Sequence, residues 1–292
     1  MEWQEVLLKL IKNKISLFGI GIIIFFVIIS ISAPWLAPPA DPDDPYMIPR
    51  AGWSIQPKPP SEDHIFGTSE GQYDIFYGII WGARTAFRVG LIVVGISTLI
   101  GILIGTIAGF YGGVIDEILM RITDVFLSMP FLVAAIVLTT ILGKGLDNVM
   151  IALVTFGWMG TARLMRSQVL EIKAEEFIQA AEALGANDIR IIMKHVILNT
   201  IFPVVINASM RMGSIVITAS SLSFLGVGAP TGYADWGQMI SFSRNWILGS
   251  QGNALQFWYT VLIPGLAITF FCLSWNLVGD AFRDILDPKL QN

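Results

Sequence analysis

Residues 89–115, VGLIVVGISTLIGILIGTIAGFYGGVI, decide the fold. This run of 27 residues lies between Arg88 and Asp116 and contains no charged side chain. A helix needs roughly 20 apolar residues to cross the hydrocarbon core of a bilayer, which is about 30 Å thick. The run is therefore long enough to form a transmembrane helix, and it predicts a membrane protein.

Comparable charge-free runs occur along the rest of the chain. Four of them hold between 19 and 35 residues, and a shorter one, 148–162, holds 15. We count the short run as a span because residues at its ends can snorkel to the membrane surface. The sequence therefore predicts an all-α polytopic membrane protein with about six transmembrane helices, at residues 15–36, 87–110, 122–143, 147–165, 203–226 and 257–279.

The composition agrees with this fold class and excludes several others. Hydrophobic residues make up 54% of the 292 residues and charged residues only 14%, whereas a soluble domain usually carries about 25% charged residues. This difference excludes an ordinary soluble enzyme and a disordered chain. The net charge of −4 leaves no basic excess for binding nucleic acid. The single cysteine excludes a disulfide framework.

Lysine and arginine residues are unequally distributed between the two sides of the predicted topology. With both termini in the cytoplasm, the inner segments hold 11 of them and the outer segments hold 5. Positive residues favour the cytoplasmic side, so we expect both termini to be cytoplasmic. The predicted organisation is an N-terminal segment with the first helix (1–36), an external Pro-rich loop (37–86), a five-helix core (87–280) with a long cytoplasmic loop at about 166–199, and a cytoplasmic tail (281–292).

The outer segment from Pro34 to Pro60 contains nine of the fourteen prolines. Proline disfavours helices and promotes extended backbone, so this segment is expected to be irregular. One interpretation, which we favour, is a linker that lets the first helix stand apart from the others. The other interpretation is a surface that binds an external partner.

Three glycines in the first run, Gly101, Gly105 and Gly109, are each four residues apart. Glycines at this spacing form one smooth helix face, on which another helix packs closely. The pattern predicts a tight contact inside the helix bundle or in a dimer, and no chemistry.

The predicted cytoplasmic loop has a helical pattern of its own. Four apolar residues share one face of a short helix: Phe177, Ile178, Ala181 and Leu184. Gly185 is a natural stop for this helix, and Asn187 or Asp188 is suited to cap a second one. The loop is either an interfacial helix that rests on lipid or an element on which a cytoplasmic partner docks.

This loop also resembles the inner-loop motif of the permease subunits of ATP-binding-cassette importers, which is Glu-Ala-Ala, three residues and Gly. Here the segment is QAAEALG, residues 179–185, and Gln179 replaces the first Glu. The resemblance narrows to the dipeptide/oligopeptide/nickel branch, and within it to the shorter, C-type permease. Further matches in the expected order lie at residues 64–68, 82–84, 108–113, 162–163, 222–226, 236–237 and 279–288. The sequence departs from the pattern of the branch at Ser69, where an Asp is usual, at Leu198, where a proline is usual, and at Ala219, where a Glu is usual.

The resemblance implies a transport machine with several subunits. It implies a homologous second permease, two cytoplasmic ATPases that hold ATP and Mg, an extracytoplasmic solute-binding protein, and a bacterial or archaeal cell (inner) membrane. The solute most often carried by the branch is a di- or oligopeptide, and nickel and oligosaccharides are the alternatives. The resemblance places the ATPase-coupling helix at Glu176, Phe177, Gln179, Ala180, Ala181, Glu182, Leu184, Gly185, Ala186, Asn187 and Asp188.

The motifs of the chain agree with a machine in which other subunits hydrolyse ATP. A phosphate-binding loop requires G-x-x-x-x-G-K-[ST], and the single Gly-Lys pair, Gly143-Lys144, is followed by Gly145 on the predicted outer side. We therefore expect no catalytic residues, no metal site and no cofactor in this chain, with ATP hydrolysis on partner subunits. The competing classes are an autonomous secondary transporter, which typically needs intramembrane acidic residues, and a membrane-embedded enzyme.

A row of polar residues marks the predicted fifth helix. Arg211 lies roughly 12 Å into this helix, given a rise of about 1.5 Å per residue, and a charge at such a depth usually faces the bundle or a cavity. One interpretation is a charge that is paired structurally near the inner boundary. The other is a translocation path, or a contact with the partner permease, lined by Asn207, Arg211, Ser214, Thr218 and Ser221.

Overall fold

A computed structural model of the chain describes residues 13–247, 253 and 255–286. Parts of the predicted N-terminal segment (1–12) and of the predicted tail (287–292) lie outside the described residues. The described residues form helices joined by turns and loops, with no strand among them, which confirms the all-α fold class.

The helices follow one another along the chain with few long connections. Their bounds are α2 (Lys14–Leu36), the 3-10 turn η1 (Glu70–Gln72), α3 (Ile75–Tyr111), α4 (Gly113–Leu127), α5 (Phe131–Leu142), α6 (Leu146–Gly157), α7 (Met159–Lys173), α8 (Glu176–Ala183), α9 (Asp188–Ile191), the π-helical turn η2 (Ile192–Val196), α10 (Ile197–Phe224), α11 (Trp236–Phe242) and α12 (Trp258–Leu286). Four helical stretches are long and apolar enough to cross a membrane, and the bent pair α4–α5 gives a fifth if it counts as one span.

The second predicted span begins too late. It was expected at residue 87, but α3 begins at Ile75, where Asp74 caps the helix by accepting a hydrogen bond from the backbone N–H of Tyr77 at 2.9 Å. The charge-free run starts directly after Arg88, but the helix extends further toward the N-terminus, through Arg88 and Arg84 and as far as Ile75. The charged residues therefore mark the end of the apolar run, but they do not mark the end of the helix.

Two other predicted spans are broken. The segment 122–143 is divided at Pro130 into α4 and α5, which meet at an angle of 85°, because proline lacks the N–H and clashes with the preceding turn. The segment 147–165 is divided at Trp158 into α6 and α7. The fifth predicted span is longer than expected, since a helical path runs from Asp188 to Phe224. The first predicted span corresponds closely to α2, and the sixth begins with α12.

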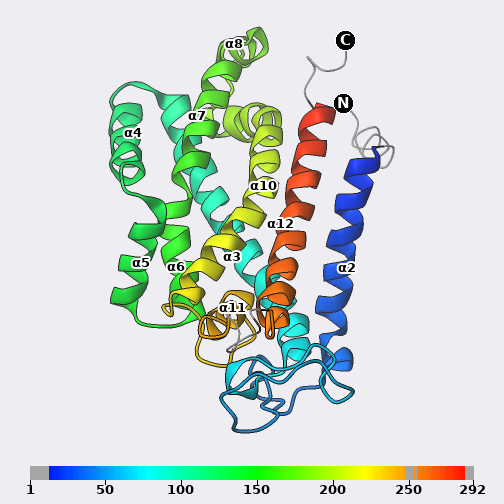
Figure 1. Cartoon of the computed structure of the whole chain (residues 1–292). Helices are drawn as coiled ribbons and strands as arrows, with labels where there is room; N and C mark the ends of the chain where they lie inside the picture. Colours follow the sequence, from blue (N-terminus) through cyan, green and yellow to red (C-terminus); the bar gives the residue numbers. More distant parts are fainter. Residues whose placement is uncertain (1–12, 248–252, 254, 287–292) are drawn as a thin grey trace.

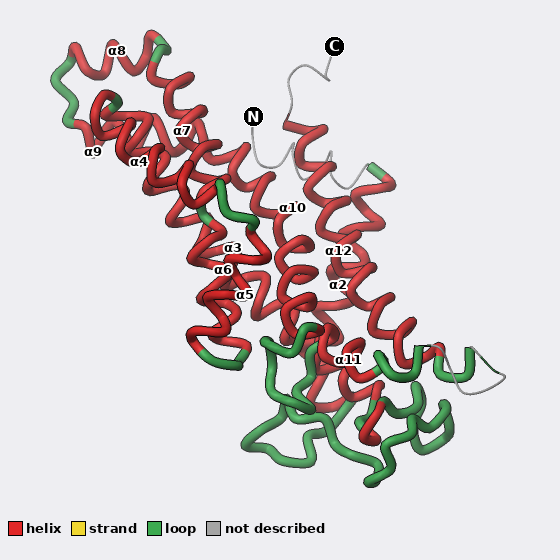
Figure 2. The backbone as a smooth tube through the Cα atoms, turned by 60° about the vertical axis from the view of Figure 1, so that its left-hand side comes forward, coloured by secondary structure: helices red, strands yellow, loops and turns green. Residues whose placement is uncertain are grey.

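The long helices lie side by side in one bundle (Figure 1). Helix α3 runs through it and contacts α6 and α7 on one side, while α10, α12 and α2 follow on the other. The start of α2, the end of α12 and α8 lie at one end of the bundle. The Pro-rich segment and α11 lie at the opposite end, where most of the loop structure is found (Figure 2).

The tightest helix contact is between α3 and α7, through the three spaced glycines. A Cβ atom on Gly105 would lie 2.4 Å from the backbone oxygen of Ala162, and one on Gly109 would lie 2.8 Å from Cβ of Val169. At Gly101 the nearest atoms also belong to α7 or the residue before it. The predicted close packing is confirmed, and it occurs inside this chain.

The Pro-rich segment is folded against the helices. The indole N–H of Trp81 donates to the backbone oxygen of Ala37 at 2.9 Å, and the hydroxyl of Tyr77 donates to that of Pro45 at 2.7 Å. Helix α2 is packed in the bundle as well, because its Phe26 is buried against Trp236 and Phe271. The expectation of a linker that leaves the first helix apart is therefore wrong.

The first prediction concerns the α3–α7 contact. In Gly105→Ala, the added methyl group has no room, so we expect the two helices to separate and the free energy of unfolding to fall by about 1–3 kcal/mol. The matched control is Gly95→Ala in the same helix, where a Cβ would have nothing within 4 Å. Thermal unfolding in detergent, followed by tryptophan fluorescence, checks this. Equal midpoints for both variants would contradict the packing argument.

The second prediction concerns Asp235, which caps α11 in the loop after α10 and is buried. Burial raises the pKa of Asp235 to about 6, although hydrogen bonds from Gln238, Ser223 and Gly237 oppose this shift. The pKa of an unfolded Asp is about 3.9. The contribution of Asp235 to stability is therefore complete below about pH 4 and is lost as the pH rises through about 6. We expect Asp235→Asn to remove this part of the pH dependence of the unfolding midpoint, and an unchanged profile would contradict the assignment.

Candidate functional site

The chain between α6 and α10 forms a helical arm, residues 159–196, at the end of the bundle that lies away from the Pro-rich segment (Figure 1). Helix α8 ends in a Schellman motif, in which the N–H of Ala186 donates to Ala181 O at 3.1 Å and that of Gly185 to Glu182 O at 2.9 Å. Gly185 has a φ of +78°, which favours glycine. Asn187 then caps α9, since its side chain accepts from the N–H of Arg190 at 2.9 Å. The predicted order of helix, glycine and helix is confirmed.

The helical arm has an apolar core of its own. Ile178 of α8 and Ile191 of α9 are buried. They belong to a cluster whose other buried members come from α3, α7, the π turn and α10: Phe110, Met165, Val169, Val196 and Val204. Lys173, at the end of α7, donates from Nζ to the backbone oxygen of Phe110 and lies 5.2 Å from the centre of its ring. These contacts hold α8 in a fixed position relative to α3 and α7.

The apex of the helical arm is exposed. Leu184 is 88% exposed and Ile189 is 72% exposed, and the acidic residues Glu182 and Asp188 lie close to them along the chain. Of the four apolar residues expected on one face, Ile178 is buried in the core of the arm, whereas Leu184, at the C-cap of α8, is exposed. Among the residues predicted for coupling, Ala181 and Ala186 are half-buried and the others are exposed: Glu176, Phe177, Gln179, Ala180, Glu182, Leu184, Gly185, Asn187 and Asp188.

The predicted polar row lies along α10. Its hydroxyl groups donate to backbone oxygens of the same helix: Ser214 to Arg211 at 3.0 Å, Thr218 to Ser214 at 2.8 Å and Ser221 to Ile217 at 2.8 Å. Ser214 is exposed, and Asn207, Thr218 and Ser221 are half-buried. The row is therefore polar, but each of its three hydroxyl protons is already donated in a hydrogen bond within the helix.

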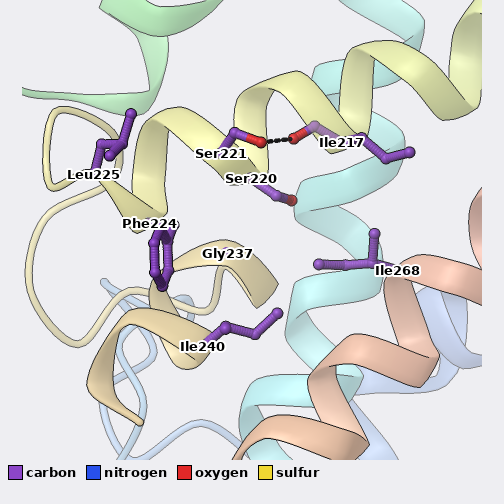
Figure 3. A pocket seen from close by; sticks show the side chains of 8 residues that line it. All are labelled: Ile217, Ser220, Ser221, Phe224, Leu225, Gly237, Ile240 and Ile268. Atoms are coloured by element: carbon purple, nitrogen blue, oxygen red, sulfur yellow. Dashed lines mark hydrogen bonds between the residues drawn. The ribbon is translucent and has the colours of Figure 1, made fainter. Parts of the chain in front are cut away.

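The Ser221 end of the polar row opens into a groove of about 410 Å³. Figure 3 shows Ser221 on the rim of this groove, with side chains of α10, α11 and α12 around it. The groove is lined by Ile217, Ser220, Ser221, Phe224, Leu225, Gly237, Ile240 and Ile268. Sequence analysis identified Ser221 alone among them as a residue of the translocation path, because the other seven lie on three different helices or outside the polar spacing.

Arg211 differs from the rest of the polar row. Its Nη1 donates to the hydroxyl of Thr161 at 2.9 Å, and its Nη2 donates to the backbone oxygen of Gly157. The ion pairs within the described parts of the chain do not include Arg211. The structure thus joins Arg211 to the break between α6 and α7. Sequence analysis missed both partners, which are about 50 residues away along the chain.

Two family models match the sequence. The model described as "binding-protein-dependent transport system inner membrane component" matches residues 101–292, and the model described as "N-terminal TM domain of oligopeptide transport permease C" matches residues 2–59. Together they span most of the chain.

Individual relatives agree with these models. The dipeptide transport system permease protein DppC of Alkalihalophilus pseudofirmus is 37% identical over 99% of this chain and 91% of its own length. The oligopeptide transport system permease protein OppC of Bacillus subtilis is 34% identical over 99% of this chain and 90% of its own length.

A solved structure supports the fold. A chain of the inward-facing MetNI methionine ABC transporter matches with a TM-score of 0.55 and 18% identity, over 73% of this chain and 98% of that chain. The match supports the helical arrangement alone. The family models and the relatives show that this chain belongs to the inner membrane components of binding-protein-dependent transport systems, in the dipeptide and oligopeptide branch of the ATP-binding-cassette permeases.

Proposed function

We propose that this chain is one permease subunit of an ATP-driven importer, which receives a di- or oligopeptide from an external binding protein and passes it into the cytoplasm. A homologous second permease and two cytoplasmic ATPases complete the machine. ATP and Mg are held by the ATPases, and this chain performs no hydrolysis. The membrane is the inner or only cell membrane of a bacterium or archaeon.

The observation that carries this proposal is the exposed apex of the helical arm. An apex with large apolar side chains, held by a buried core, has the properties of a protein docking element: its anchors are preorganised and lose little side-chain freedom on binding. Leu184 and Ile189 are the most exposed apolar side chains there. They supply anchors for a cleft on an ATPase, and Glu176, Glu182 and Asp188 favour a basic rim around that cleft.

The proposed path lies on the polar row of α10. Exposed and half-buried hydroxyl groups that are already bonded within the helix offer a hydrated surface without strong binding sites, which suits a solute that must leave again. The groove at the end of the row then faces either the solute or the partner permease. In the importing cycle, ATP closes the ATPase pair, the two arms move with it, and the path turns outward.

The experiment that tests the proposal is purification of the tagged chain from its native membrane in mild detergent. A second permease and one or two ATPases with phosphate-binding loops should accompany it in near-stoichiometric amounts. The binding protein is then assayed with dipeptides, oligopeptides, Ni²⁺ and oligosaccharides, and peptides should bind most tightly. Isolation of the chain alone, even after crosslinking, would overturn the proposal in favour of a secondary transporter.

The third prediction concerns the apex. Leu184→Glu adds a charge to the proposed apolar anchor, so we expect about tenfold less ATPase to remain bound, which corresponds to about 1.4 kcal/mol. The control is Ile55→Glu, an exposed residue of the Pro-rich segment at the opposite end of the bundle. The ratio of ATPase to permease after affinity purification measures the effect. Full retention by Leu184→Glu would remove Leu184 from the interface.

The fourth prediction concerns the polar row. Ser214→Trp and Thr218→Trp should block peptide uptake by filling the path, while the complex still assembles. The control is Thr140→Trp, which changes an exposed threonine of α5 that bonds its own helix in the same way. Uptake of labelled dipeptide by proteoliposomes is measured. Normal uptake by the two α10 variants would remove the path interpretation.

A further inference from the structure

The chain breaks between α6 and α7 beside the continuous helix α3. Gly157, the last residue of α6, is so close to α3 that a Cβ on it would lie 3.2 Å from Cβ of Ser97. The last four carbonyls of a helix have no donor within that helix, and an unpaired carbonyl is costly in a membrane bundle. A donor from another element can satisfy a carbonyl at such a break.

Arg211 of α10 supplies this donor. Its guanidinium bonds Gly157 at the end of α6 and Thr161 in the first turn of α7, so one planar group holds both sides of the break. The negative end of the α6 dipole also favours a cation at this position. The helix end and its carbonyl groups thus stabilise the positive charge of Arg211, although no carboxylate of the described residues pairs with it.

A movement of the helical arm has two routes to the polar row. One route runs along α10 itself, but this path contains the π turn Ile192–Val196 and then Pro203. Both features are common causes of helix bending, and proline removes one helical hydrogen bond. The helix can therefore bend along this route, so that only part of a displacement of α8 reaches Ser214.

The second route avoids these features. Helices α3 and α7 form a tightly packed pair through Gly105 and Gly109, and α7 leads directly to α8. Arg211 connects the start of α7 to α10 at a point beyond Pro203 and three residues before Ser214. Helix α10 also packs directly on α3, where Met212 lies against Gly90. Arg211 adds to this packing a polar connection to the start of α7, so a displacement of the α3–α7 pair reaches the polar row through the guanidinium as well as through side-chain packing.

We propose that Arg211 is a positioning residue that makes the polar row of α10 follow the α3–α7 pair when an ATPase moves the helical arm. This inference rests on the proposed function. It predicts a specific defect when Arg211 is changed: ATP is still hydrolysed, but the path no longer follows, so hydrolysis is uncoupled from uptake.

The test measures ATP hydrolysed per peptide transported, with the complete complex in proteoliposomes. For Arg211→Gln we expect this ratio to rise about tenfold, within the usual range of coupling between sites, at a nearly unchanged rate of ATP hydrolysis. Arg211→Lys keeps the charge but loses the fork that spans two partners, so it should rescue only part of the coupling. Thr161→Val removes one of the two bonds and should raise the ratio by a smaller factor.

The matched control is Arg163→Gln. Arg163 also lies at the start of α7, but it pairs with Asp124 of α4 on the surface, so its loss should leave the ratio unchanged. A ratio that stays at the wild-type value in Arg211→Gln overturns the proposal. So does a parallel loss of hydrolysis and uptake together with a lower unfolding midpoint, because this would mean a purely structural role.

Two further results keep the outcome clear. If Arg211→Gln does not fold, Thr161→Val carries the test: an increased ratio supports the proposal and an unchanged ratio overturns it. If no ATPase accompanies the wild-type chain, the proposed function fails as well and the inference falls with it. An intact complex with an unchanged ratio in Arg211→Gln and Thr161→Val rejects the inference alone.

Discussion

The close approach of α3 and α7 is the constraint on which the rest of the structure depends. Helices in lipid gain little from hydrophobic burial against each other, so they associate through small residues that allow close backbone contact. Gly105 and Gly109 provide this contact along the C-terminal half of α3. Because α7 is fixed on α3, α8 has a defined position, and the core of the helical arm can form around Ile178 and Ile191.

The hydroxyl groups and the guanidinium of the polar row on α10 are hydrogen-bonded locally. Ser214, Thr218 and Ser221 bond to backbone oxygens of their own helix, and Arg211 bonds to the open end of α6. These choices avoid unpaired polar atoms in an apolar environment. They also place polar surface on one face of α10 without a strong binding group, while the one cation in the row holds two segments together.

Much of the fold could be predicted from the sequence because apolar runs and glycine spacing are local signals. The arm was also predictable, since Gly185 and Asn187 determine the ends of α8 and α9 through local backbone geometry. The start of α3 was not predictable in this way. The spans were predicted from runs without charged residues, and Arg84 and Arg88 interrupt such a run although both lie inside the helix. The partners of Arg211 and the docking of the Pro-rich segment depend on contacts between residues distant in the chain, which a single sequence does not encode in its spacing.

The glycine contact has a consequence for synthesis of the chain. Thr161, which faces Gly101 in the folded bundle, is made 60 residues later. At about 5–20 residues per second, α3 spends roughly 3–12 s in the membrane or its insertion machinery before α7 exists. Throughout this interval its glycine face is exposed to lipid or to an insertion factor. The order of synthesis therefore makes α3 a helix that must remain inserted with its glycine face uncovered until α7 is made, although α2, which also contacts α3, is already present.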